Sequence, residues 1–176
     1  KEEYSAATFR PKITRQLADV FFRTLGSVTR AMSAVVEEIN LILMDYNLDA
    51  AHEGQQLAGM LNLAVVHKGV LFICHCGPTQ TFVLPPESVD IFGQNMAVKS
   101  MGANRTVQVQ FFQADLKPGN VLAFCANPPY SWTPSNLNGS SYLAMEQVRR
   151  RLLNQAGEDL QALVVKLNPG QGKIHE

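Results

Sequence analysis

Apolar residues recur every three or four positions through the first quarter of the chain. This spacing is typical of amphipathic helices. Gly26 interrupts the pattern, and Ser27 after it can cap a new helix, so the sequence predicts helices over residues 11–25 and 28–46. Pro11 suits the first turn of the first helix. We expect the two helices to pack one apolar stripe against a sheet.

Three short apolar runs follow, with turn residues between them. They read LNLAVVH, VLFICHC and TQTFVL, and Lys68-Gly69 forms a tight turn between the first two. This pattern predicts an antiparallel meander of three strands. An irregular segment then leads to VQVQFFQADL, in which Val107, Val109 and Phe111 alternate with glutamines as in a half-buried strand.

The last third of the chain begins with a Pro-Gly turn, which leads into the apolar run VLAFCA. A loop rich in Pro, Asn and Ser follows, with the sequence NPPYSWTPSNLNGSS. The apolar pattern predicts a helix over residues 141–156 and a closing strand over LQALVVKL. The sequence contains no internal repeat, so we expect residues 1–176 to form a single domain.

The charge balance argues against large anionic partners. Fifteen basic residues offset fifteen acidic ones, and charged residues make up only 17% of the chain. No overall field attracts nucleic acid or a membrane surface, so we expect neither as a partner. No apolar run is long enough for a membrane-spanning helix. Three cysteines cannot all pair within one chain, which favours reduced thiols and a cytoplasmic location.

Cys74, His75 and Cys76 lie next to one another in the second apolar run. Along a strand, the two cysteines point to one face and the histidine to the other. These three side chains therefore cannot converge on zinc, even with Cys125 nearby, and adjacent strand residues do not form a cysteine-histidine catalytic pair. The sequence favours buried structural thiols.

Four local motifs resemble the metal-dependent protein phosphatases of type 2C. LAVVHKGVLFICHCGPTQTFVL resembles the hairpin after which that family carries a Gly-Asp motif, and VKSMG resembles its Thr-Arg-Ala-Leu-Gly-like segment. ADLKPGNVLAFCANPPY resembles its Pro-Gly-Asp to Ser-Asp-Gly segment, and GEDLQALVVKL resembles its closing strand. The resemblance implies a four-layer αββα sandwich of two antiparallel sheets flanked by helices, in the α+β class, with two or three divalent cations at one end.

The acidic residues of that family are mostly replaced here. On this alignment Pro78 stands at the aspartate of the Gly-Asp motif and Gln80 at its arginine. Asn127 stands at the metal-bridging aspartate, with Pro128 at the glycine after it. Only the closing motif keeps an acidic residue at its metal-binding position, and this residue is either Glu158 or Asp159. Divalent cations need several carboxylate oxygens, so these vestigial positions predict no metal site and no catalytic residue.

The resemblance therefore implies a catalytically inactive phosphatase-like domain that acts as a binding or regulatory module. It would need no cofactor, and its partner would be another protein or another domain of the same chain. One alternative is an active serine/threonine phosphatase that uses Mn²⁺ or Mg²⁺ with atypical ligands. Another is an unrelated α/β ligand-binding domain whose match to the family is coincidental.

Two further features concern binding. Tyr130 and Trp132 lie in a proline-stiffened loop, where they either form a recognition surface or fold back over the sheet edge.

The family's sandwich also opens with strands ahead of its first helix, and at most residues 1–10 remain for them here. A sheet without those strands exposes an edge, so we expect a homodimer or a partner segment along that edge, unless residues 1–10 form a short covering strand.

Overall fold

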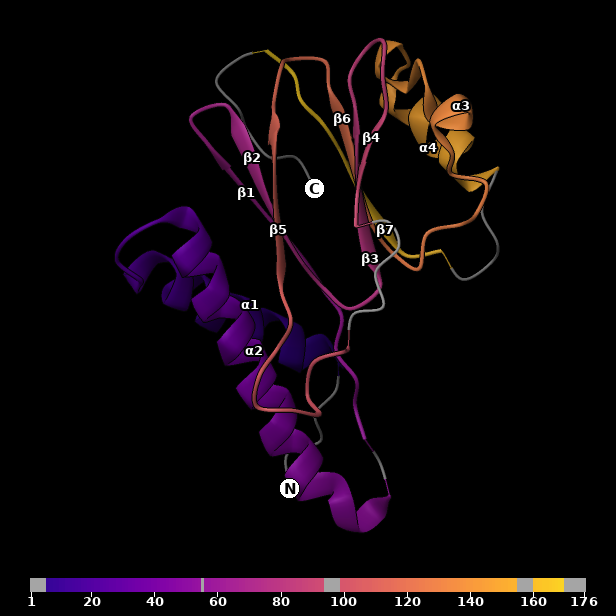
Figure 1. Cartoon of the computed structure of the whole chain (residues 1–176). Coiled ribbons are helices and arrows are strands. Elements are labelled where there is room, and N and C mark those ends of the chain that lie inside the picture. Colours follow the sequence, from indigo (N-terminus) through magenta and orange to yellow (C-terminus); the bar gives the residue numbers. More distant parts are fainter. Residues whose placement is uncertain (1–5, 55, 94–98, 155–159, 170–176) are drawn as a thin grey trace. The chain divides into compact units, whose positions relative to one another are not determined.

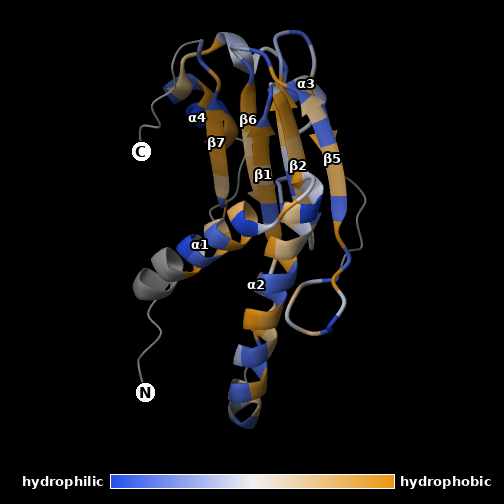
Figure 2. Ribbon diagram, turned by 90° about the vertical axis from the view of Figure 1, so that its left-hand side faces the viewer, coloured by the Kyte–Doolittle hydropathy of each residue, from blue (hydrophilic) through white to orange (hydrophobic). Residues whose placement is uncertain are grey.

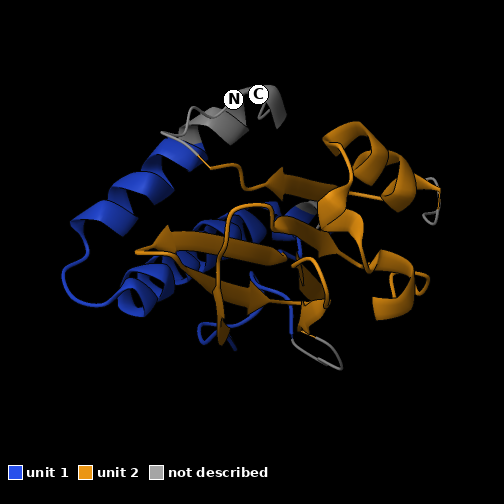
Figure 3. Cartoon of the chain, turned by 90° about the horizontal axis from the view of Figure 1, so that it is seen from above, with its two compact units in different colours: residues 1–59, 99–109 blue, residues 60–98, 110–176 orange. Residues whose placement is uncertain are grey.

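The computed structural model describes residues 6–54, 56–93, 99–154 and 160–169. Contacts divide the chain into two compact units (Figure 3). Unit 1 comprises residues 1–59 and 99–109, and unit 2 comprises residues 60–98 and 110–176. Figure 1 shows the elements in chain order.

Unit 1 contains two long helices and a short one, namely α1 (Ala6–Arg23), α2 (Val28–Ala50) and the 3-10 helix η1 (Ala51–Glu53). The break predicted between the long helices is confirmed. Gly26 has a φ of 118°, a backbone conformation that side-chain-bearing residues rarely adopt. The hydroxyl of Ser27 then accepts a hydrogen bond of 3.1 Å from the backbone N–H of Arg30 and caps α2.

Both long helices extend further than the sequence pattern predicts. Helix α1 begins at Ala6 and continues through Pro11, which removes one backbone hydrogen bond without ending the helix. A covering strand over residues 1–10 is therefore wrong for residues 6–10, and the rest of that segment lies outside the described residues. Helix α2 continues to Ala50, since no glycine or proline follows the predicted end to stop it.

A buried asparagine on α2 binds the second segment of unit 1. Asn40 is 1% exposed, and its Nδ2 donates to the carbonyl of Asn104 at 2.9 Å. Its Oδ1 accepts from the backbone N–H of Gly102 at 2.8 Å. Two turns further along α2, Asn47 Nδ2 donates to the carbonyls of Leu57 and Gly102, each at 2.9 Å. Amide side chains on one helix face thus satisfy the backbone groups of an irregular segment.

Unit 2 contains two antiparallel sheets and two short α-helices, so the predicted fold class of two antiparallel sheets with helices is confirmed. One sheet has the order β1-β2-β5, with β1 (Leu61–His67), β2 (Val70–Cys76) and β5 (Gln110–Asp115). The other has the order β4-β3-β6-β7, with β4 (Asp90–Phe92), β3 (Thr79–Leu84), β6 (Val121–Ala126) and β7 (Ala162–Lys166). The helices are α3 (Pro134–Leu137) and α4 (Met145–Leu153), with the 3-10 helix η2 (Ser140–Tyr142) between them.

The predicted three-stranded meander is wrong at its second turn. Strands β1 and β2 do form a hairpin, but β3 belongs to the other sheet, where it pairs with β4 and β6. The chain changes sheet at Gly77, whose φ is 78°. The sequence suggested a meander because β2 and β3 are apolar on both faces, and such runs do not show which sheet a strand joins.

Three other elements differ from the prediction. Strand β5 begins at Gln110 rather than Val107, because the preceding residues belong to unit 1, where the carbonyl of Asn104 binds Asn40. The segment predicted to be irregular contains the short strand β4. Helix α4 also begins later than residue 141, since a left-handed Gly139 and the 3-10 helix η2 precede it.

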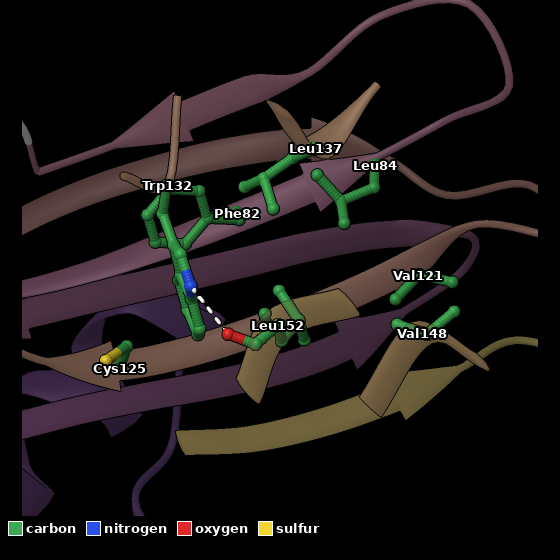
Figure 4. Packing of buried hydrophobic residues seen from close by; sticks show 9 residues of the cluster. Phe82, Leu84, Val121, Cys125, Trp132, Leu137, Val148 and Leu152 are labelled. Carbon is green, nitrogen blue, oxygen red and sulfur yellow. Dashed lines mark hydrogen bonds between the residues drawn. The ribbon is translucent and has the colours of Figure 1, made fainter. Parts of the chain in front are cut away.

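Two apolar clusters organise unit 2. One lies between the sheets, with Leu71 and Ile73 of β2 against Val83 of β3 and Leu122 of β6. The other lies between the second sheet and helices α3 and α4 (Figure 4). It contains Phe82, Leu84, Val121, Trp132, Leu137, Val148 and Leu152. Strands β3 and β6 therefore bury both faces, and Figure 2 shows the strands of this unit largely in the hydrophobic colour.

None of the described helices combines the length and hydropathy that crossing a membrane requires.

We predict that Asn40→Ala lowers the free energy of unfolding by about 2 kcal/mol, because it leaves the buried backbone N–H of Gly102 without a partner and also removes the bond to the carbonyl of Asn104. Urea unfolding measures this loss. Asn47→Ala is the matched control, since this side chain is half-buried and water can replace its bonds. Equal losses for the two variants would contradict the prediction.

Candidate functional site

The turn between β2 and β3 forms one wall of the candidate site. Gly77 reverses the chain, and its carbonyl accepts a hydrogen bond of 2.8 Å from the N–H of Thr79. Pro78 projects from this turn and is exposed, while Thr79 beside it is buried. The turn therefore presents a rigid apolar ring in the position that the family resemblance assigns to an aspartate.

Asn127 follows directly after β6 and adopts a φ of 54°. Asparagine tolerates this left-handed conformation better than most residues. Its backbone N–H donates a hydrogen bond of 3.1 Å to the carbonyl of Pro78. This bond continues the β3–β6 ladder past the ends of both strands, because Thr79 pairs with Ala126 in that ladder. The structure thus brings together two of the positions that the sequence analysis selected.

A cleft of about 620 Å³ opens beside this pair of residues. It lies wholly within unit 2. Its lining comprises Pro78, Gln80, Gly93, Asn127, Pro128, Pro129, Tyr130, Trp132, Thr133 and Pro134. None of these lining residues carries a charge. The lining side chains that can form hydrogen bonds are the amides of Gln80 and Asn127, the hydroxyls of Tyr130 and Thr133, and the indole of Trp132, and the rest of the lining is proline and glycine.

The loop beyond Asn127 is held rigidly. The N–H of Trp132 donates to the carbonyl of Pro129 at 3.0 Å, which closes a turn with Tyr130 near its tip. The Trp132 ring is 4% exposed and lies edge-on against Phe82, with ring centroids 5.3 Å apart. Its Nε1–H donates to the carbonyl of Leu152 at 3.3 Å (Figure 4). Trp132 therefore folds back onto the second sheet.

The two aromatic candidates thus separate in the structure. Trp132 is buried, so the prediction that it belongs to a recognition surface is wrong, and the residue instead anchors its loop. Tyr130 is fully exposed and packs against nothing around it. Tyrosine combines a large apolar ring with a hydroxyl group, and a rigid turn presents it at a low entropic cost. Tyr130 is therefore an aromatic side chain of this loop that a partner can reach.

A buried polar chain lies next to the cleft. His75 Nε2 lies 2.8 Å from the hydroxyl of Thr81, and that hydroxyl donates to Asn62 Oδ1 at 3.1 Å. Because the Thr81 proton is used by Asn62, the hydroxyl accepts from His75, and the neutral ring carries its proton on Nε2. His75 Nδ1 is left as a buried acceptor without a partner among the described residues.

Gly93 lies between this histidine and the cleft. Its φ is 85°, and a Cβ at this position would lie 2.5 Å from both His75 Nδ1 and the carbonyl oxygen of Thr79. Only glycine fits there without displacing the ring. Burial lowers the pKa of His75 from 6.5 to about 4, because the charged imidazolium is disfavoured in the sheet interior.

The three thiols occupy the interior, as the sequence predicts. Cys74 and Cys76 share one face of β2, and His75 points to the opposite face, where its ring contacts Phe112. Burial raises the pKa of Cys74 to about 12, with a further rise from Cys76. The value of about 12 for the pKa of Cys74 includes the smaller effect of Cys76. Burial likewise raises the pKa of Cys76, and that of Cys125 to about 11. Among the described residues, no group of histidine, cysteine and acidic side chains is arranged to hold a metal ion.

The remaining sequence candidates, Glu158 and Asp159, lie outside the described residues. No sequence pattern signals the role of Gly93, because it depends on contact with His75, eighteen positions earlier in the chain.

Several solved protein phosphatases share this fold. PppA, a key regulatory component of T6SS in Pseudomonas aeruginosa, matches with a TM-score of 0.63 and 13% identity over 88% of this chain and 79% of that chain. Serine/threonine phosphatase Stp1 from Staphylococcus aureus matches with a TM-score of 0.66 and 14% identity over 84% and 72%. The catalytic domain of PstP, in complex with 2 manganese ions, matches with a TM-score of 0.63 and 12% identity over 86% and 76%. No protein-family model and no curated sequence matches the chain.

The fold is therefore that of the metal-dependent type 2C protein phosphatases, and the resemblance seen in the sequence is confirmed at this level. The alternative of an unrelated α/β domain is therefore wrong at the level of the fold. The lining of the cleft does not fit the cations of that class, because it offers no carboxylate among the described residues.

We predict that a colorimetric thiol reagent at pH 8 leaves Cys74, Cys76 and Cys125 unmodified in the folded protein and modifies all three in urea. Burial blocks access, and the raised pKa values keep the thiols protonated. The variant Ser135→Cys, at an exposed position of α3, should react at once and serves as the control. Rapid modification of any native cysteine would contradict the buried structural role.

We also predict that stability falls as the pH falls from 6.5 towards 4. In this window the unfolded chain binds a proton at His75 and the folded chain does not, so the free energy of unfolding decreases by at most about 1.4 kcal/mol per pH unit for this one group. Urea unfolding at several pH values measures the slope. His75→Gln should remove this part of it, and an identical slope in the variant would show that other groups cause the effect.

Proposed function

We propose that this chain is a phosphatase-like domain without metal-dependent catalysis, which works as a binding or regulatory module. The observation that carries the proposal is the lining of the cleft, where Pro78 and Asn127 meet at the positions that the family resemblance assigns to metal-binding aspartates. Proline offers no side-chain oxygen. The amide of Asn127 can contribute an oxygen ligand but brings no charge to offset a cation.

Electrostatics supports the same view. Neighbouring carboxylates repel one another unless cations neutralise them. A cleft with the carboxylates for two cations is therefore destabilised when no cation is bound. Here the lining residues are neutral, and the cleft needs no ion to balance them. The amide of Gln80, in the place of the family's arginine, likewise offers no positive charge for a phosphate group.

The end of unit 2 that carries the cleft can still bind a partner. Tyr130 is exposed on a turn that Trp132 anchors in the core, and exposed tyrosines on rigid loops often dominate protein interfaces. We infer that the partner is another protein or another segment of the same chain. The balanced charge disfavours nucleic acid and membrane surfaces, and the buried thiols suit a reducing compartment such as the cytoplasm.

We predict that calorimetric titration with Mn²⁺ or Mg²⁺ detects no pair of ions bound with micromolar affinity, and that the protein does not hydrolyse a generic aryl phosphate in their presence. Asn127→Asp alone should not restore either property, because one carboxylate cannot balance two divalent cations. Two bound Mn²⁺ ions per chain together with metal-dependent hydrolysis would instead establish an active phosphatase with atypical ligands.

A further inference from the structure

Strand β7 is one edge of the four-stranded sheet and pairs with β6 on one side only. Just beyond its end, Leu167 directs both backbone groups towards the start of β6. Its N–H donates to the carbonyl of Asn120 at 2.9 Å, and its carbonyl accepts from the N–H of Gly119 at 2.6 Å. Backbone groups alternate sides along a strand, so every second residue of β7 faces away from β6.

The residues whose backbone N–H and carbonyl groups point outward are therefore Ala162, Val164 and Lys166. They have no hydrogen-bond partner for these groups within the part of the chain that the structure describes. Natural proteins cover such edges or protect them with charge, because an open edge invites a further strand. The only charge along this edge is Lys166, and its Nζ is turned towards the carbonyls of Ser141 and Leu143.

A second observation concerns the face of β7 that carries Leu163 and Val165. Val165 packs into the apolar cluster between the two sheets. Leu163 has the same orientation two residues earlier, lies beside Phe124 in the ladder, and is nevertheless 63% exposed. A leucine within a strand, on the face that elsewhere packs against the opposite sheet, is thus left without cover. A strand added beside β7 would bring a side chain next to it.

We propose that β7 pairs antiparallel with β7 of a second copy of this chain, about a twofold axis at Val164. In this register Val164 lies opposite Val164 of the copy, and their outward backbone groups bond to each other. Leu163 lies opposite Val165 of the copy on the same face, so each leucine gains an apolar neighbour. Lys166 lies opposite Ala162 of the copy, so no like charges meet.

This complementarity is the reason for choosing a second copy over another partner. In a twofold pairing, the same strand supplies both partners, so each residue must fit the residue of the copy that lies opposite it. Strand β7 meets this condition in both charge and side-chain size. Strand β5, an edge of the other sheet, exposes the polar side chains of Gln110, Gln113 and Asp115, and its exposed apolar residue Phe111 is 39% exposed, less than Leu163. The paired segment is short, so the dimer should be weak and should depend on protein concentration.

Sedimentation velocity across a range of protein concentrations tests the proposal. The expected result is a reversible equilibrium between the 19.4 kDa chain and a species of twice that mass. Ala162 is exposed and gives a matched pair of variants. Ala162→Lys places a like charge opposite Lys166 of the copy and should raise the dissociation constant about fivefold, whereas Ala162→Glu should lower it by about the same factor.

Thermal unfolding of each variant confirms that the fold is intact, and Leu163→Lys should weaken the dimer without changing the melting temperature of the monomer. A monomer at every concentration would overturn the proposal. A dimer that responds equally to Ala162→Lys and Ala162→Glu would also overturn it, because its interface would lie elsewhere. Neither result bears on metal binding or hydrolysis, so the proposed function is tested separately.

Discussion

The burial of β3 and β6 on both faces is the constraint on which the rest of unit 2 depends. In β3, Phe82 and Leu84 point to the helical side, and Val83 between them points to the other sheet. Two apolar faces must be covered by two separate layers, so one sheet and the helices α3 and α4 are both required. The β3–β6 ladder ends at the hydrogen bond between Asn127 and Pro78, and this places the candidate site at the end of the best-buried strands.

This arrangement separates the residues that hold the fold from most of the residues that line the cleft. The favourable free energy of folding comes mainly from apolar burial, and apart from Trp132 the residues of the core cluster are not those that line the cleft. The side chains at positions 78 and 127 are outside that core cluster. Trp132 connects the two regions, since it lines the cleft and also packs on Phe82. Trp132 thereby fixes the shape of a cleft whose lining is uncharged.

Buried polar side chains give each unit its specific geometry. In unit 1, Asn40 satisfies backbone groups of a segment sixty residues away in sequence, and no apolar residue of similar size could do so. In unit 2, the Thr81 hydroxyl links Asn62 of β1 to His75 of β2 and so ties both sheets together. The uncompensated Nδ1 of His75 is the cost of this arrangement, and the ring stays neutral because burial disfavours its charge.

The local pattern of the chain was enough to predict most of the elements. The helix break at Gly26, the β1–β2 hairpin, strand β6 and the inward thiols follow from periodicity, turn residues and the alternation of side chains along a strand, all of which act over a few residues. The motifs that resemble the phosphatase family also assigned Pro78 and Asn127 to metal-binding positions, and the hydrogen bond between them came only from the structure.

Tertiary structure alone decided what depends on residues far apart in sequence. The passage of β3 into the second sheet could not be inferred from an apolar run, since a strand buried on both faces fits either sheet. Whether Trp132 faces the solvent or the core depends on Phe82 and Leu152, and the need for glycine at position 93 depends on the His75 ring. Long-range packing sets these outcomes, and a linear pattern carries no information about which distant surfaces will meet.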